Sequence, residues 1–201
     1  GCGNGVALCC LLYRVSGLEV FGVEMDKRAA DLCKRNIDLN MFKAKICNIN
    51  IANTIRELKS VSFDHVFMNP PYFKQNSVKK SHTLSSHQAK VESMPLSAWV
   101  SVAKNRCKPN GKITIIQRVE RLPDIIKCLN GYFGQVTVQP ISSFKDTSPK
   151  TVIVQATKTS GAAFKLLAPK IVHRRDGISG KVVYEDEFKK ILRYGHPLQL
   201  N

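Results

Sequence analysis

The sequence is short of acidic residues. Its 201 residues contain 31 lysines and arginines against 15 aspartates and glutamates, which gives a formal net charge of +16 and a pI near 9.7. Such an excess of positive charge favours a polyanionic partner. Nucleic acid is the first candidate, and an anionic membrane surface is the second.

Long apolar runs and paired cysteines are also missing. No stretch approaches the ~20 apolar residues of a transmembrane helix, and no signal peptide is recognised at the start. The seven cysteines are odd in number and include no Cys-x-x-Cys pair. We therefore expect reduced, mostly buried thiols, no metal site and a cytoplasmic location.

The length and a hydrophobic content of 43% suit one α/β domain over residues 1–201. Strands alternate with helices, and two strands near the end, at 135–140 and 151–157, fit an antiparallel pair at the edge of the sheet. This order predicts a doubly wound, mostly parallel sheet with an antiparallel last strand. The chain opens with glycine inside a motif, so we expect it to be truncated at its N-terminus and to lack the first strand.

Residues 63–73, Phe-Asp-His-Val-Phe-Met-Asn-Pro-Pro-Tyr-Phe, are the most informative stretch. The apolar run at 66–68 predicts a strand covered on both faces, and Pro70 and Pro71 end it. Ligands of open α/β sheets bind at the carboxyl ends of strands. There, the Asn69 side chain and the Asn69 and Pro70 carbonyls offer acceptors beside the ring of Tyr72, an arrangement that suits a planar amine. Asn69, Pro70, Pro71 and Tyr72 are the candidate catalytic residues.

A second candidate site lies near the start of the chain. Residues 1–5, Gly-Cys-Gly-Asn-Gly, form a glycine-rich turn that opens an apolar helix, where the backbone can approach a ligand closely. A strand at 18–26 ends in Glu24, whose carboxylate can accept both ribose hydroxyls of a nucleoside. Asp26 is the expected N-cap of a helix that begins at Lys27 and presents Ala30, Cys33, Ile37 and Met41 on one face.

Two long segments contain no acidic residue. The first, residues 65–91, follows the Asn-Pro-Pro-Tyr motif and suits a substrate loop that contacts phosphates, and the second covers residues 148–175. A solvated charge run is the alternative interpretation. Helices are expected at 95–108, with Trp99 in the core, at 118–129 and at 184–194. The breaker residues 108–111, Lys-Pro-Asn-Gly, end the first of these helices before a strand at 112–117. The candidate RNA-binding residues are Lys74, Lys79, Lys80, Lys90, Lys165, Lys170, Arg174 and Arg175.

Together these motifs resemble the S-adenosylmethionine-dependent amino-methyltransferases that carry Asn-Pro-Pro-Tyr. Members methylate adenine N6, guanine N2 or a glutamine side chain. Segments 117–122, 150–156 and 191–195 make the chain most similar to bacterial enzymes that methylate adenine N6 beside the anticodon of a valine tRNA.

The resemblance implies S-adenosylmethionine as cofactor, tRNA as partner and direct methyl transfer without a metal. A strand and its exit are expected at 44–51, where the family usually has an acid near the cofactor adenine and this chain has Asn48 or Asn50. A protein-glutamine N5 methyltransferase, an rRNA guanine-N2 methyltransferase and an inactive, truncated RNA-binding remnant are the alternatives. The candidate cofactor-binding residues are Gly1, Cys2, Gly3, Asn4, Gly5, Glu24, Met25, Asn48, Asn50 and Asn69.

Overall fold

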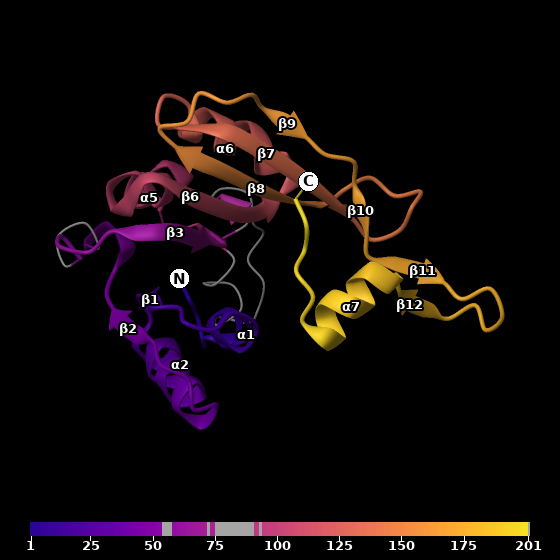
Figure 1. Ribbon diagram of the computed structural model, residues 1–201, viewed down its shortest axis with the longest axis horizontal. Helices are drawn as coiled ribbons and strands as arrows, with labels where there is room; N and C mark the ends of the chain where they lie inside the picture. Colours follow the sequence, from indigo (N-terminus) through magenta and orange to yellow (C-terminus); the bar gives the residue numbers. More distant parts are fainter. Residues whose placement is uncertain (54–57, 72, 75–90, 93, 201) are drawn as a thin grey trace. The chain divides into compact units, whose positions relative to one another are not determined.

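The computed structural model describes residues 1–53, 58–71, 73–74, 91–92 and 94–200 (Figure 1). The chain divides into two compact units. Unit 1 comprises Gly1–Phe63 and Ser97–Arg106, and unit 2 comprises Asp64–Leu96 and Cys107–Asn201. No helix within the described ranges has the length and apolar character needed to cross a membrane. The organisation of residues 1–201 as a single domain stays a prediction.

Unit 1 contains two parallel strands and the helices around them. Strand β1 (Phe21–Glu24) pairs with β2 (Lys45–Asn48), so that Glu24 lies opposite Asn48. Both strands form where the sequence predicts them, but each is shorter. The remaining elements are α1 (Val6–Arg14), α2 (Lys27–Leu39), the 3-10 turn η1 (Ile51–Asn53) and most of α5 (Leu96–Arg106).

Helix α2 confirms the predicted N-cap. The Asp26 carboxylate accepts a hydrogen bond of 2.8 Å from the Ala29 N–H, and the helix buries Ala30, Cys33 and Ile37. The prediction for Met41 is wrong. The helix ends at Leu39, and Met41 has a φ of 56° and is 91% exposed, because the chain has already turned away from the helix axis.

Unit 2 is built on a six-stranded sheet with the order β10-β7-β8-β6-β3, in which β9 also pairs with β7. Strand β8 runs antiparallel to both β6 and β7, which confirms the antiparallel strand expected near the end of the fold. The β7–β8 pair is not at the edge, however, because β9 and β10 pair with β7 in parallel. The strands are β3 (Phe63–Met68), β6 (Cys107–Arg118), β7 (Phe133–Ser142), β8 (Thr151–Lys158), β9 (Lys165–Leu166) and β10 (Lys170–Ile171).

The centre of this sheet supplies the core of unit 2. Alternate residues of β8, among them Val152 and Val154, are fully buried, and so are Ile113 and Ile115 of β6. This period of two is the pattern expected for strands. In β3 the predicted coverage of both faces is wrong for Phe67, which is 52% exposed; within unit 2, β3 is the last strand in the order.

Strand β6 begins earlier than the sequence predicts. Residues 108–111, Lys-Pro-Asn-Gly, were expected to separate a helix from a strand at 112, but β6 already starts at Cys107. Asn110 takes a φ of 60°, and a side chain at Gly111 would lie 2.6 Å from Cys107 Sγ and 3.0 Å from the Asp64 carbonyl oxygen. Asparagine tolerates the left-handed region and glycine has no Cβ, so Asn110 and Gly111 allow the strand to continue through this segment.

The C-terminal part of unit 2 adds a hairpin and a helix. Strands β11 (His173–Arg175) and β12 (Val182–Tyr184) pair antiparallel, and α7 (Asp186–Tyr194) follows (Figure 1). Helix α6 (Leu122–Leu129), preceded by the 3-10 turn η3 (Val119–Arg121), buries Ile125 and Leu129. Two short strands, β4 (Phe73–Lys74) and β5 (Val91–Glu92), pair in parallel.

Candidate active site

In unit 1, Glu24 ties the glycine loop to the end of β1. Its Oε2 accepts a hydrogen bond of 2.8 Å from the Gly3 N–H, and its Oε1 accepts one of 3.0 Å from the Asp26 N–H. Each carboxylate oxygen can accept a further hydrogen bond, so the two backbone N–H groups orient the carboxylate and both oxygens remain available to a ligand. A carboxylate held in this way suits the paired hydroxyls of a ribose.

The glycines of the loop are required by the backbone. Gly3 and Gly5 have φ angles of 56° and 86°, and a Cβ at Gly5 would lie 2.6 Å from Cys33 Sγ of α2. Gly5 is also the N-cap of α1. At Gly1, a Cβ would lie 3.0 Å from Cη2 of Trp99 on α5, a residue expected in the core that is only partly buried. The loop is thus pressed against two helices of unit 1.

The cysteines beside this loop are protonated at neutral pH. Cys2 Sγ and Cys33 Sγ lie 4.0 Å apart. Burial raises the pKa of Cys33 to about 12, and burial also raises the pKa of Cys2. A thiol with such a high pKa is a poor nucleophile. All seven cysteines lie in described segments, but only Cys33 and Cys107 are buried, so the expectation of mostly buried thiols is wrong.

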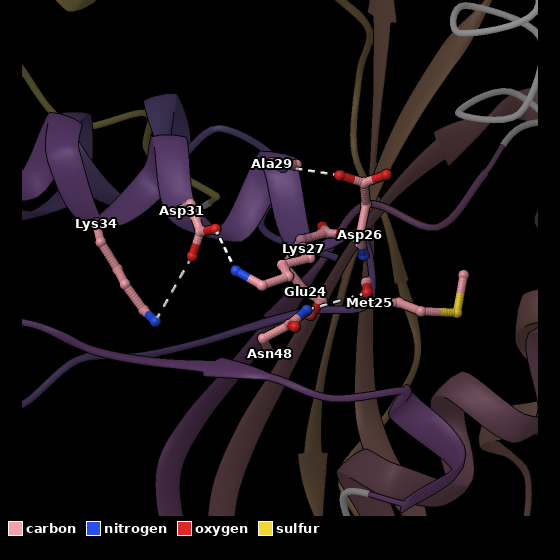
Figure 2. Close-up of polar contacts among 8 residues, drawn as sticks. All are labelled: Glu24, Met25, Asp26, Lys27, Ala29, Asp31, Lys34 and Asn48. Atoms are coloured by element: carbon pink, nitrogen blue, oxygen red, sulfur yellow. Dashed lines mark hydrogen bonds and ion pairs between the residues drawn. The ribbon is translucent and has the colours of Figure 1, made fainter.

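The two candidate asparagines both contact the chain that follows β1. Asn48 Nδ2 donates to the Glu24 carbonyl at 2.9 Å and to the Met25 carbonyl at 3.0 Å (Figure 2). Asn50 Nδ2 lies 3.3 Å from Met25 Sδ. The side chain of Met25 is 57% exposed. Asn4 contributes its carbonyl, which accepts a hydrogen bond of 2.8 Å from Asn36.

Unit 1 therefore gathers nine of the ten candidate cofactor-binding residues around one strand end. The tenth, Asn69, belongs to unit 2. Because Asn48 donates a hydrogen bond to the Glu24 carbonyl, it stabilises the backbone that presents the Glu24 carboxylate.

In unit 2, the Asn-Pro-Pro turn follows β3 directly. Asn69 is exposed and Pro70 is buried. Gln117 of β6 is fully buried, and its Nε2 donates to the Pro70 carbonyl at 3.1 Å and to the Pro71 carbonyl at 3.3 Å. Its Oε1 accepts a hydrogen bond of 2.9 Å from the Arg118 N–H. Tyr72 lies outside the described residues.

Gln117 is the residue of the site that the sequence left without a role. The Pro70 carbonyl, one of the acceptors expected at the turn, receives a hydrogen bond from Gln117, which lies on a strand distant in sequence. A carbonyl oxygen has two lone pairs, so one remains for a further donor. The available signal was a glutamine at the end of the apolar run Ile-Thr-Ile-Ile, where a buried amide has to find hydrogen-bond partners.

Only some of the candidate RNA-binding side chains can be placed. Lys165 and Arg175 are exposed. Lys170 pairs with Glu187, while Arg174 lies 3.6 Å from Glu185 and 3.9 Å from Asp186, so carboxylates of α7 and its N-cap partly neutralise these two. The side chain of Lys74 in β4 is not described, and Lys79, Lys80 and Lys90 lie outside the described residues.

Within the part of the chain that the structure describes, no three His, Cys, Asp or Glu side chains are grouped to hold a metal ion. In unit 1, a carboxylate and side-chain amides gather at the end of β1, where they can bind a nucleoside through hydrogen bonds. In unit 2, the carbonyls of the Asn-Pro-Pro turn can accept hydrogen bonds from an amine.

The order of elements defines a class I, Rossmann-like methyltransferase fold, and a solved structure agrees. A predicted O-methyltransferase of Agrobacterium tumefaciens superimposes with a TM-score of 0.74 at 20% identity, covering 95% of this chain and 85% of that one. The family model described as "Methyltransferase small domain" matches residues 1–144, so the chain belongs to this methyltransferase family. Membership agrees with the expected cofactor, S-adenosylmethionine.

Curated relatives match at lower coverage. A Porphyromonas gingivalis protein named tRNA1(Val) (adenine(37)-N6)-methyltransferase is 27% identical over 131 residues, which are 62% of this chain and 50% of the relative. A Methanocaldococcus jannaschii protein, whose name gives methyltransferase without a substrate, is 32% identical over 92 residues, 45% of this chain and 35% of the relative. The chain spans about half the length of the curated relatives it matches, or less.

Proposed function

We propose that this chain is the methyltransferase domain of an enzyme that methylates the N6 amine of an adenine in tRNA, beside the anticodon of a valine tRNA. The observation that carries the proposal is the Asn-Pro-Pro turn at the end of β3, whose two proline carbonyls are held by the buried Gln117. The name of the Porphyromonas gingivalis relative supports the choice of substrate.

In this proposal the residues around Glu24 hold the cofactor. The Glu24 carboxylate, fixed by the N–H groups of Gly3 and Asp26, has lone pairs left for ribose hydroxyls. The left-handed glycines keep side chains away from the loop, where a ligand can approach the backbone. S-adenosylmethionine supplies an electrophilic methyl group when it is bound.

Asn69 and Pro70 hold the amine that receives the methyl group. An exocyclic amine is a weak nucleophile because its lone pair is delocalised into the ring. Acceptance of its two N–H bonds by the Asn69 side chain and the Pro70 carbonyl returns electron density to the nitrogen and stabilises the positive charge that develops on it. Tyr72 would stack on the base after it leaves its neighbours in the RNA.

The test is methyl transfer from labelled S-adenosylmethionine to total tRNA, followed by nucleoside analysis. N6-methyladenosine in a valine tRNA is the expected product. Label in N2-methylguanosine of rRNA, or in a glutamine of a protein fraction, would replace this assignment by one of the alternative methyltransferases. RNA binding without any transfer would favour an inactive remnant.

The substitution Asn69→Ala tests whether methyl transfer depends on the Asn-Pro-Pro turn. It should lower the single-turnover rate at saturating tRNA and cofactor by roughly 10²–10³, as loss of one charge-stabilising contact does, with a much smaller effect on either affinity. Asn105→Ala, at an exposed asparagine of α5, is the matched control and should keep the wild-type rate. A near-normal rate for Asn69→Ala would mean that the turn is only scaffold.

A further inference from the structure

Three aromatic rings lie in a row beside the C-terminal hairpin, one pair of them stacked and the other tilted. His173 of β11 lies opposite Tyr184 of β12, and their rings stack with centroids 5.0 Å apart at 27°. The Phe144 ring, from the loop after β7, lies 5.8 Å from the His173 ring, and the Arg175 guanidinium lies 6.0 Å from the centroid of Phe144. We call Phe144, His173, Arg175 and Tyr184 the stacking surface.

The backbone holds this surface in place from both sides. The His173 N–H donates to the Ser143 carbonyl at 2.9 Å, which ties β11 to the residue that follows β7. Phe144 is fixed in its turn by Thr147, whose Oγ1 bonds both its N–H and its carbonyl. The rings therefore do not need a ligand to be ordered, and a binding event here would cost little conformational entropy.

The turn between the two strands is equally well defined. Asp176 Oδ1 accepts hydrogen bonds from the N–H groups of Ile178, at 2.7 Å, and Ser179, at 3.0 Å. Hydrogen bonds from Ser179 and Ile178 lower the pKa of the Asp176 carboxyl, so this carboxylate stays ionised and keeps the turn closed at neutral pH. The hairpin presents its side chains on a preformed backbone.

The stacking surface is accessible, and Arg175 adds one positive charge to it. Tyr184 is 40% exposed, and Arg175 is exposed as well. Arg174 is engaged with Glu185 and Asp186, whereas Arg175 lies over an aromatic ring instead. Rings beside a guanidinium on a chain of net charge +16 are the combination that binds unpaired nucleotides, by stacking on the base and contact with the phosphate.

We propose that the stacking surface binds an unpaired base of the RNA substrate, with Tyr184 stacking on the base and Arg175 contacting its phosphate. This inference rests on the proposed function, because it assumes an RNA substrate. It adds a second contact, on an element remote in sequence from the Asn-Pro-Pro turn, that recognises single-stranded RNA without reading its sequence.

The experiment measures the affinity of the 201-residue chain for a short unstructured RNA and for the same RNA annealed to its complement. Tyr184→Ala should weaken binding of the single strand roughly 5- to 150-fold, the range for loss of one base stack, and should abolish the preference over the duplex. Tyr184→Phe keeps the ring and should bind like the wild type. Tyr13→Ala, at a tyrosine of α1 that is 79% exposed, is the matched control.

A fluorescent probe separates stacking from general attraction. With 2-aminopurine in the single strand, the wild type should quench the fluorescence, and Tyr184→Ala should not. Arg175→Gln should weaken binding and reduce its salt dependence, whereas Arg175→Lys should keep the salt dependence. Unchanged melting temperatures of the Tyr184 variants would show that a weaker affinity does not come from unfolding.

The outcomes separate this inference from the proposed function. If the wild type methylates tRNA but Tyr184→Ala binds the single strand with wild-type affinity and quenching, the stacking surface does not bind an unpaired base. The proposed function is then unaffected. If Tyr184→Ala instead abolishes self-association or binding of a protein, the surface serves a protein partner. If the wild type binds no RNA, the RNA substrate and this inference both fall.

Discussion

Gln117 orients the proline carbonyls of the Asn-Pro-Pro turn. Gln117→Leu keeps the volume but removes both donors, which leaves the Pro70 and Pro71 carbonyls without their partner. Methyl transfer should slow by about 10²-fold, since small displacements of a reacting group have effects of this size, while cofactor affinity stays unchanged. Gln117→Glu should be at least as damaging, because a carboxylate would face two carbonyl oxygens. Single-turnover rates and calorimetry would measure both effects.

The matched control for Gln117 is a second buried glutamine in the same sheet. Gln139 of β7 is 2% exposed and donates to the carbonyls of Pro140, at 3.0 Å, and Ala168, at 2.8 Å. Gln139→Leu should cost a comparable ~1–3 kcal/mol of stability, but the folded variant should transfer methyl groups at the wild-type rate. Equal rate losses in the two variants would reduce Gln117 to a residue of general stability.

Glu24 should matter for binding of the cofactor and much less for chemistry. Glu24→Ala removes the acceptor of the Gly3 and Asp26 N–H groups and the expected acceptor of the ribose hydroxyls. We expect S-adenosylmethionine to bind more weakly by ~1–3 kcal/mol in calorimetry, the range for a lost charged hydrogen bond. Glu19→Ala, at a 73% exposed glutamate that pairs with Lys45, should leave the affinity unchanged. Unchanged affinity for Glu24→Ala would remove Glu24 from the site.

At the scale of residues, the sequence predicted those groups whose role depends on neighbours along the chain. Asp26 caps the helix that begins at the next residue, and Glu24 ends its own strand, so spacing was enough to find them. Gln117 could not be found in this way, because its partners are 46 and 47 residues away and depend on the pairing of strands. Which buried residue supports an exposed motif depends on how the strands of the sheet pair, and local spacing along the chain does not show it.

At the scale of elements, a row of polar side chains crosses three adjacent strands of unit 2. His65 Nε2 of β3 lies 2.8 Å from Thr114 Oγ1 of β6, and Gln155 Nε2 of β8 donates to the same oxygen at 3.2 Å. Partial burial of the ring, and next the charge of Lys112, lower the pKa of His65 below its ordinary value. The folded protein therefore favours the neutral ring more than the unfolded chain does.

This shift predicts how stability depends on pH. Below about pH 6.5, the ordinary pKa of histidine, the unfolded chain binds a proton that folded His65 resists, so the free energy of unfolding should fall as the pH decreases. Above that pH the contribution is fully present. Urea unfolding at pH 7.5 and 5.5 should show a smaller decrease for His65→Asn, which keeps a polar side chain but does not titrate. An identical decrease in both proteins would contradict the shift.

The sequence predicted elements better than it predicted their ends. Periodicity identified β1, α2, β2 and β8, because apolar spacing reports which face is buried. It failed around residues 108–111, where Pro, Asn and Gly usually break a strand, since the strand passes them with Asn110 in the left-handed region. It also placed β7 at the edge, because strands of two residues such as β9 and β10 leave no periodic signal.

At the scale of the whole molecule, the net charge was visible in the sequence but its distribution was not. From the spacing of charges alone, Lys170 and Arg174 were as good candidates for RNA binding as Lys165 and Arg175. The structure separates them, since carboxylates at 185–187 pair with the first two. Folding brings these acids to the hairpin, so a segment without acidic residues in the sequence is not free of acids in space.

The last prediction concerns how this charge acts on RNA. If the excess of positive charge serves phosphate binding, the affinity for tRNA should fall steeply with salt, and each lost phosphate contact should reduce the log–log slope by about one. Lys165→Gln, at an exposed lysine, should lower the slope in this way, and so should removal of the lysines at 74–90. Lys27→Gln should change it little, because Lys27 on α2 pairs with Asp31 at 2.8 Å. Titrations of tRNA at a series of salt concentrations would measure the slopes. If neither Lys165→Gln nor removal of the 74–90 lysines changes the slope, the RNA contacts lie elsewhere. If all three variants lower the slope equally, only the total charge matters.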